Sequence, residues 1–168
     1  MLCTWCAIFL LLASHASAEP WSAQIVDYGV YEVSRGASVE NENVAAGLVV
    51  SYGKQLIKKT DQVEAILGTN FGFRYVLSGP DADVYVTIKV KHPTALKGPE
   101  SGKEFTSSKW GQSVPVGVGN VNWNTGWIFE EDWEIVPGEW VMQLYVGEAK
   151  LLEKTFFIKD GRKDISKK

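Results

Sequence analysis

The chain contains 168 residues, of which 45% are hydrophobic and 22% charged, and its formal net charge is −3. A chain of this size can bury a substantial hydrophobic core in one domain. Its lysines and acidic residues are interspersed, which excludes the one-sided basic surface of a typical nucleic-acid-binding protein.

Residues 1–18 have the layout of a secretory signal peptide. An apolar run, too short to span a membrane, leads to the small residues Ala-Ser-Ala at positions 16–18. We predict cleavage after this site and therefore a periplasmic or secreted protein. The cut removes both cysteines, Cys3 and Cys6. The domain expected over residues 19–160 must then be stabilised by its core without disulfides.

The segment after the predicted cleavage site alternates between apolar and polar residues, which is the pattern of β-strands. Residues 23–33 predict a first strand, with a bulge at Gly29. Residues 60–70 are less regular. The spacing of Asp61 and Glu64 resembles a capping box and predicts one helical turn there.

Two strands with clean alternation follow, at residues 71–78 and 83–91. Turn residues (Gly-Pro-Asp, 79–81) separate them. Each strand has one apolar and one polar face, as expected of a sheet with one buried side. We expect the second strand to end near His92, because Pro93 follows it.

Residues 94–126 are too long for a structureless loop in a compact domain. We therefore expect at least one short strand there, near Val114, Val116 and Val118. Two tryptophans, Trp110 and Trp123, also fall in this irregular region. They are the tryptophans that we expect to be exposed and able to contact a ligand.

Residues 127–140 read WIFEEDWEIVPGEW. In a continuous strand the odd-numbered positions would form one apolar face, made by Trp127, Phe129, Trp133 and Ile135. Glu131 would be the single charged residue on that face. Because burying an unpaired carboxylate costs several kcal/mol, we predict a break at 130–132 that carries Glu131 to solvent.

The other acidic residues of this stretch are expected to face water: Glu130, Asp132 and Glu134. Acids two residues apart match the carboxyl spacing of inverting glycosidases, but any acidic alternation on a strand gives the same spacing, so we predict no catalytic role. Pro137-Gly138 fits the central positions of a type II turn.

Two strands are predicted at the end of the chain, at residues 140–146 and 150–158. Their inward residues include Trp140 and Phe156, and Lys154 falls on the same face as Phe156. A bulge or an edge position would accommodate this lysine. Residues 161–168 are predicted to be a basic, solvated tail.

These segments predict an all-β fold, an antiparallel immunoglobulin-like β-sandwich of about seven to eight strands. The Cys…Trp…Cys pattern of true immunoglobulin domains is absent, so the prediction concerns the architecture alone.

The sequence offers little for catalysis or metal binding. His92 is the only histidine after the predicted cleavage site, so it is the only base that a Ser-His-Asp triad could use. The glycine-rich residues 117–126 lack the G-x-G-x-x-G spacing of a phosphate cradle. The acidic residues do not match a calcium-binding loop. We predict no cofactor, no metal and no enzymatic activity.

Three segments carry a family resemblance: FGFRYVLSGP (71–80), the strand that ends in KHP (91–93), and the FEEDWEIVPGEW region (129–158). They resemble the bacterial domain-of-unknown-function family 3859, over about residues 22–159. The position of Asp132 is often proline in that pattern, which agrees with a kink there, and this chain departs from it. The resemblance implies a bacterial exported protein and assigns no catalytic residue.

Three hypotheses for the function remain. The first is a non-enzymatic binding or interaction domain whose partner is an unknown protein or polysaccharide of the cell envelope. The second is a carbohydrate-binding module that uses Trp110 and Trp123. The third is a hydrolase built on His92, which would need a pocket with a neighbouring serine or carboxylate. No nucleic acid and no membrane span are expected.

Overall fold

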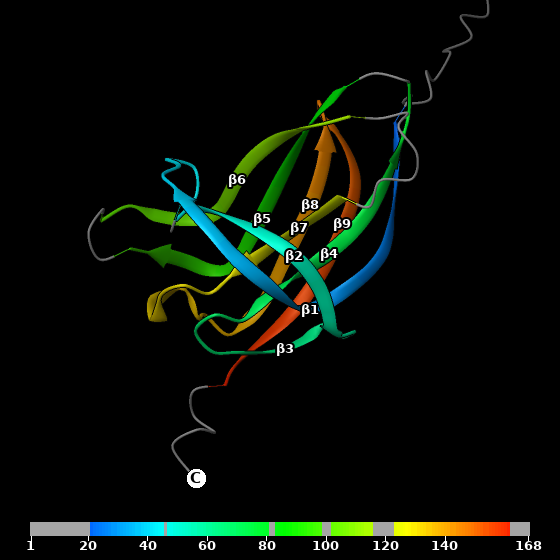
Figure 1. Cartoon of the computed structure of the whole chain (residues 1–168). Helices are drawn as coiled ribbons and strands as arrows, with labels where there is room; N and C mark the ends of the chain where they lie inside the picture. Colours follow the sequence, from blue (N-terminus) through cyan, green and yellow to red (C-terminus); the bar gives the residue numbers. More distant parts are fainter. Residues whose placement is uncertain (1–20, 46, 81–82, 99–101, 116–122, 162–168) are drawn as a thin grey trace, which may run out of the picture.

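The computed structural model describes residues 21–161 except 46, 81–82, 99–101 and 116–122. The predicted signal peptide and most of the predicted tail lie outside this part. The described chain forms nine strands in two packed sheets (Figure 1). The predicted β-sandwich is therefore confirmed.

The strands and the single short helix are, in chain order, β1 (Ser22–Val39), β2 (Leu48–Lys58), β3 (Gln62–Ala65), β4 (Asn70–Ser78), β5 (Val84–Lys97), β6 (Glu104–Val114), β7 (Trp123–Ile128), the 3₁₀ helix η1 (Asp132–Glu134), β8 (Gly138–Val146) and β9 (Ala149–Asp160). The four-stranded sheet has the order β2-β1-β4-β7, and the five-stranded sheet has the order β3-β9-β8-β5-β6. All pairs are antiparallel except β3 with β9.

The core lies between the sheets and follows the predicted alternation. The inward residues of β4 and β5 are all buried: Phe71, Phe73, Tyr75, Leu77, Val84, Val86, Ile88 and Val90. Phe71 packs against Phe129, Trp140 and Phe156, with ring centroids between 5.2 and 5.9 Å apart. This aromatic cluster joins β4 to β8 and β9, so it holds the two sheets together.

Beyond Tyr31, β1 pairs only with β2, and this part of the β1–β2 hairpin extends past β4 toward the other sheet. In Figure 1 its tip reaches β6, which belongs to the other sheet. The amide of Lys109 on β6 donates to the carbonyl of Asn43 at 2.9 Å, and the amide of Ala45 donates to Ser108 Oγ at 3.5 Å. The hairpin therefore covers the side of the sandwich on which β7 is the edge strand of one sheet and β6 the edge strand of the other.

The helical turn predicted for residues 60–70 is wrong, because this segment contains β3. Val63 and Ala65 are fully buried while their neighbours are exposed, so burial at alternate positions decides in favour of a strand. The amide of Gln62 is capped by Thr60 Oγ1 at 3.0 Å, and not by a helical capping box.

The strand end predicted at His92 is also wrong, since β5 continues to Lys97. The pairing of β5 with β6 shifts register between Lys91 and Leu96, and Pro93 lies inside this irregular stretch. A proline without an N–H group is tolerated at such a bulge.

Residues 94–126 contain the whole of β6 and the first part of β7, so the expected additional strand is present. Val114 is the buried last residue of β6, whereas Val116 and Val118 lie outside the described residues. β6 begins ten residues before Val114, which makes it much longer than the short strand that was expected.

The break predicted at 130–132 is confirmed, because η1 interrupts the chain there and Glu131 is exposed. The predicted Pro137-Gly138 turn is not observed. The chain reverses earlier, through the bond from the amide of Glu134 to the carbonyl of Glu131 at 3.0 Å, and Gly138 begins β8.

The predicted bulges occur, but at shifted positions. Two of the register shifts in β1, between Ile25 and Asp27 and between Val30 and Tyr31, lie on either side of Gly29. In β9 the register with β8 shifts between the pairs Leu144–Leu152 and Tyr145–Lys150, before Lys154.

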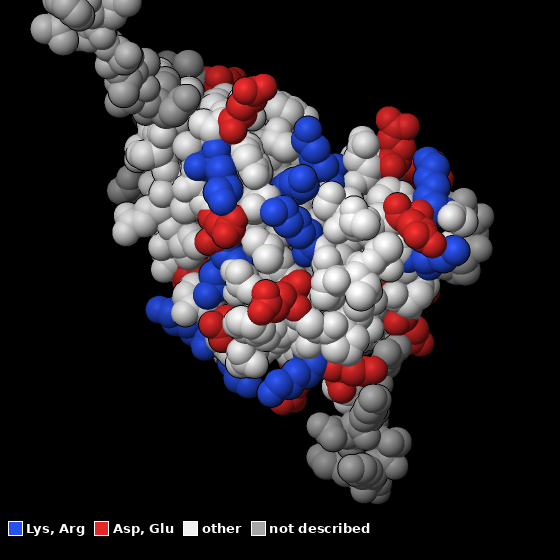
Figure 2. All heavy atoms as spheres, turned by 180° about the vertical axis from the view of Figure 1, so that it is seen from behind, with Lys and Arg blue, Asp and Glu red and all other residues white. Residues whose placement is uncertain are grey.

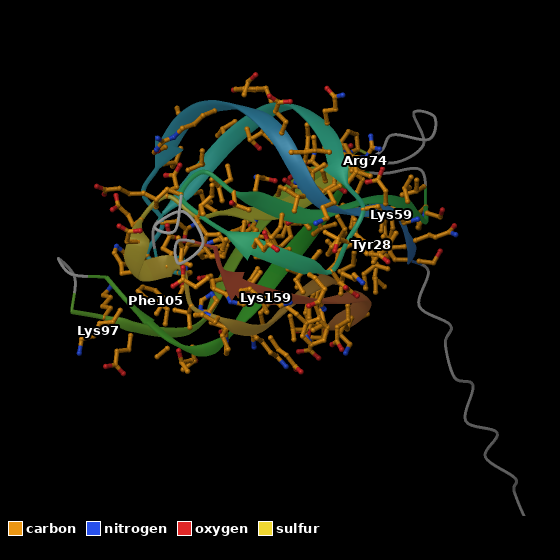
Figure 3. The ribbon with its side chains drawn as sticks, turned by 90° about the horizontal axis from the view of Figure 1, so that it is seen from below. Tyr28, Lys59, Arg74, Lys97, Phe105 and Lys159 are labelled. Atoms are coloured by element: carbon orange, nitrogen blue, oxygen red, sulfur yellow. The ribbon has the colours of Figure 1, made fainter. Side chains whose placement is uncertain are left out.

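Lys154 remains mostly buried, and its ammonium lies 3.7 Å from the ring centre of Tyr28. Figure 3 shows Tyr28 next to Lys59, at the end of the molecule opposite Lys97 and Phe105. The aromatic ring and the Asp61 carboxylate, 3.8 Å from the ammonium, therefore supply the partners that the sequence pattern did not reveal for this inward lysine.

Candidate ligand-binding site

The feature that most resembles a binding site is a cavity of about 360 Å³ beneath the β1–β2 hairpin, here called the edge cavity. It borders the free edges of three strands, β2, β6 and β7. Its walls are residues 44, 47–51 and 54 from the hairpin, 110–112 from β6, 123–128 from β7, and Asn70, Glu130 and Glu134.

Trp110 and Trp123 both line the edge cavity. Trp110 pairs with the buried Ile88, and Trp123 pairs with the buried Tyr75, so each points to the inner face of its own sheet. Both are half-buried. The two tryptophans predicted to contact a ligand therefore lie in the wall of one cavity, although they are less exposed than expected.

A third tryptophan, Trp127, extends this aromatic wall. Its ring centroid lies 6.4 Å from that of Trp110, and its side chain is buried. The sequence reasoning assigned Trp127 to the core, which is correct, but its indole also borders the edge cavity.

Glu134 is fully buried, so the prediction that it faces water is wrong. Helix η1 changes the strand register and turns this side chain inward. Its Oε2 accepts the backbone N–H groups of Glu130 at 2.7 Å and Glu131 at 2.8 Å. The Glu131-x-x-Glu134 spacing of a capping box was a sequence signal that could have revealed this arrangement.

The environment of Glu134 favours its protonated form. The pKa of Glu134 is raised to about 7, mainly by burial and to a smaller extent by the nearby Glu130 carboxylate. The backbone N–H groups of Glu131 and Glu130 oppose this rise, and the indole of Trp127 opposes it to a smaller extent. This carboxyl group therefore titrates near neutral pH, and it belongs to a cavity wall.

Buried polar atoms without a hydrogen-bond partner concentrate around the edge cavity. Five such side-chain atoms occur among the described residues, and four belong to cavity-lining residues: Asn70 Oδ1, Thr125 Oγ1, Trp127 Nε1 and Glu134 Oε1. An unsatisfied buried polar group costs about 1–3 kcal/mol. Their location in one place therefore points to a bound molecule that would pair with them.

Lys54 reaches the edge cavity from the hairpin. Its ammonium donates to the carbonyl of Thr125 at 3.1 Å and lies 4.6 Å from the ring centre of Tyr31. Burial lowers the pKa of Lys54 to about 8, and the charge of Asp27 opposes this change. A Cβ atom on Gly126 would lie 2.6 Å from the carbonyl oxygen of Phe71 and 2.8 Å from the Lys54 ammonium, so glycine is needed where β7 passes the β4 backbone.

A polar network fixes this side of the cavity. Asp27 accepts hydrogen bonds from the guanidinium of Arg74 and, at 2.6 Å, from the hydroxyl of Tyr31. The bond from Arg74 is the main reason why the pKa of Asp27 lies below its usual value. The network holds Tyr31, and through it the Lys54 ammonium, in place.

His92 does not belong to the edge cavity. Its Nδ1–H donates to the carbonyl of Phe105 at 2.9 Å, and its Nε2 faces Ser108 Oγ at 3.4 Å. This serine–histidine contact is what a hydrolase would require, but Ser108 is fully buried and does not line the edge cavity. Burial also lowers the pKa of His92. The pair therefore has no access for a substrate.

Other site types are less well supported. No group of three or more His, Cys, Asp or Glu side chains in the described part is arranged to hold a metal ion. No helix there is long and apolar enough to cross a bilayer. On the face shown in Figure 2, basic and acidic side chains are interspersed.

The two-sheet architecture and its open edge define the class of this protein as an immunoglobulin-like β-sandwich. A crystal structure of an immunoglobulin-like protein from Pseudomonas aeruginosa is similar to it, with 30% sequence identity and a TM-score of 0.61, covering 86% of this chain and 99% of the other.

The chain belongs to the family described as Domain of unknown function (DUF3859), whose profile matches residues 21–158. The resemblance found in the sequence is thereby confirmed. No curated protein matches the chain significantly.

Proposed function

We propose that this protein is an exported, non-enzymatic binding domain that takes a small polar ligand in the edge cavity. The observation that carries the proposal is the set of four unpaired buried polar atoms around this one cavity. A ligand that pairs with them would remove their desolvation cost on binding.

The composition of the cavity wall supports this proposal. Ligand sites usually combine apolar and aromatic walls with a few convergent polar groups, in volumes of about 300–1,000 Å³. Here three indoles supply the aromatic part and Asn70, Thr125 and Glu134 supply the polar part. The buried and closed surroundings of His92 and Ser108 support a binding role over a hydrolytic one.

A carbohydrate ligand is the second candidate. The indoles of Trp110 and Trp123 line the cavity together with hydrogen-bonding side chains. A flat aromatic surface beside hydrogen-bonding groups suits the apolar face and the hydroxyl groups of a sugar ring.

Binding can be tested by titrating intrinsic tryptophan fluorescence with glucose, N-acetylglucosamine, soluble envelope and plant polysaccharides, and small amines and alcohols. We expect at least one probe to change the emission of the wild type, and Trp110→Ala to weaken that response at least tenfold. Trp21→Phe is the matched control, because Trp21 packs against Gly79 outside the cavity wall. An equal loss in both variants, or no response to any probe, would refute the proposal.

Export is supported by the apolar run and the Ala-Ser-Ala site at positions 16–18. We propose a periplasmic or secreted location, where the domain would meet an envelope polysaccharide or protein. The intact mass of the protein recovered from the bacterial periplasm or medium tests this. We expect a mature chain that begins at Glu19, and a full-length cytoplasmic chain would contradict it.

A further inference from the structure

We infer that the edge cavity selects an organic ammonium ion, whose charged N–H groups would bind Glu134 Oε1 beside the tryptophan wall. This inference rests on the proposed function and names the chemical class of the ligand. It distinguishes the edge cavity from a site built for neutral sugars.

The first observation is a buried carboxylate without a counter-ion. Glu134 forms none of the ion pairs found among the described residues. Backbone amides bind only its Oε2, and the Trp127 indole acts on the carboxyl group too weakly to form a hydrogen bond of normal geometry with Oε1. A buried carboxylate is normally paired with a cation or protonated. A ligand cation would supply the missing charge.

A second carboxylate makes this part of the cavity more negative. Glu130 also lines the cavity, and its side chain is 14% exposed. Its partner Arg35 is 2.9 Å away, but the Arg35 side chain is 61% exposed and does not line the cavity. Arg35 therefore neutralises Glu130 from the solvent side and leaves Glu134 unpaired.

The aromatic wall is the second, independent observation. Trp110, Trp123 and Trp127 all line the cavity. The face of an indole attracts a cation within about 6 Å, and this attraction grows when both groups are shielded from water. Indoles next to a carboxylate therefore favour an organic cation over an anion or a neutral ligand.

Lys54 is the one lysine in the cavity wall, and it is held away from Glu134. Its ammonium binds the carbonyl of Thr125, whereas the Glu134 carboxylate binds the amide of Glu130. Four residues, 126–129, separate the Thr125 carbonyl from the Glu130 amide, which corresponds to roughly 13 Å of extended chain. The cation would therefore lie at the Glu134 end.

The unpaired oxygens further favour an ammonium ion that carries N–H groups. Asn70 Oδ1 and Thr125 Oγ1 can accept hydrogen bonds, as can Glu134 Oε1. A primary ammonium has three donors, whereas a quaternary ammonium has none. Primary ammonium ions are therefore expected to bind more tightly than tetramethylammonium.

The test uses n-butylammonium and n-butanol, which differ mainly in charge, in isothermal titration of the full-length mature protein at pH 8. We expect n-butylammonium to bind at least tenfold more tightly than n-butanol. Glu134→Gln should remove that preference, because the amide keeps the shape of the side chain and lacks its charge. Binding of n-butanol to this variant should change less than threefold.

The pH dependence in the wild type provides a test that needs no variant. Protonation of Glu134 at pH 5.5 should weaken the binding of n-butylammonium at least fivefold and leave the affinity for n-butanol unchanged. The other charged groups near the site are Glu130, with its partner Arg35, and Lys54. The Lys54→Met variant removes the other titratable cation of the wall, and the fivefold weakening between pH 8 and pH 5.5 should persist in it.

Two results would overturn the inference: equal affinity for the two probes in the wild type, or an unchanged preference in Glu134→Gln. If glucose or another neutral sugar binds in the cavity and n-butylammonium does not, the inference fails and the proposed function stands. If no probe perturbs the cavity tryptophans, both fail.

Discussion

Replacing Glu134 by glutamine should stabilise the protein at alkaline pH and have little effect at acidic pH. The variant keeps the hydrogen bonds to the backbone N–H groups of Glu130 and Glu131, because a glutamine oxygen can accept them. It removes the buried negative charge. The change therefore isolates the cost of ionising this side chain in the folded protein.

The magnitude follows from the pKa. The pKa of Glu134 rises from its ordinary value of 4.5 to about 7 on folding, and each pKa unit corresponds to about 1.4 kcal/mol. The folded protein therefore favours the protonated acid. Stability is lost as the pH rises from 4.5 to 7, and the loss reaches about 3 kcal/mol above pH 7.

The assay is urea unfolding of wild type and Glu134→Gln between pH 4.5 and 8.5. We expect the difference in the free energy of unfolding to change by about 3 kcal/mol in favour of glutamine across this range. Glu131→Gln is the matched control, because Glu131 is exposed and should show no such change. A difference in the free energy of unfolding between wild type and Glu134→Gln that does not change with pH would refute the raised pKa of Glu134.

Three further predictions concern the scaffold, each measured by urea unfolding at pH 7. Phe71→Ala should cost about 3–5 kcal/mol, because Phe71 is fully buried in the aromatic cluster; a cost below 1 kcal/mol would contradict this packing. Gly72→Ala should destabilise strongly or prevent folding, since its Cβ would lie 2.1 Å from the carbonyl oxygen of Thr125; a neutral result would mean that these strands do not approach so closely. Asp27→Asn should cost about 1.5–3 kcal/mol through weaker bonds to Arg74 and Tyr31. Because the folded pKa of Asp27 lies below 3.8, this cost should shrink as the pH falls through that lowered pKa, and a cost that grows toward pH 2 would contradict the account.

The alternation of apolar residues predicted much of the scaffold. It located β4 and β5, the inward tryptophans Trp127 and Trp140, and the break that exposes Glu131. These features depend on neighbouring residues along the chain, and burial of one face decides them. Short segments such as β3 were missed, because four residues carry too little pattern to outweigh a cap-like spacing.

The site was only partly predictable. Trp110 and Trp123 were selected because they fall between regular strands, but their common cavity depends on the two sheet edges that β6 and β7 provide. Lys54 reaches the cavity only because the β1–β2 hairpin arches over that edge. Glu134 was assigned to solvent, because strand periodicity does not apply across a 3₁₀ turn. Contacts between segments distant in sequence decide the first two features, whereas the local turn decides the position of Glu134.

The central claim is that the edge cavity is a ligand-binding site. The most direct measurement is the ¹⁵N–¹H spectrum of the tryptophan indole groups during titration with n-butylammonium, n-butanol and glucose. The account predicts that at least one of these probes shifts the indole signals of Trp110, Trp123 and Trp127, which line the cavity, and leaves those of Trp21 and Trp140 in place. Signals that stay fixed with every probe, or shifts confined to Trp21 and Trp140, would contradict it.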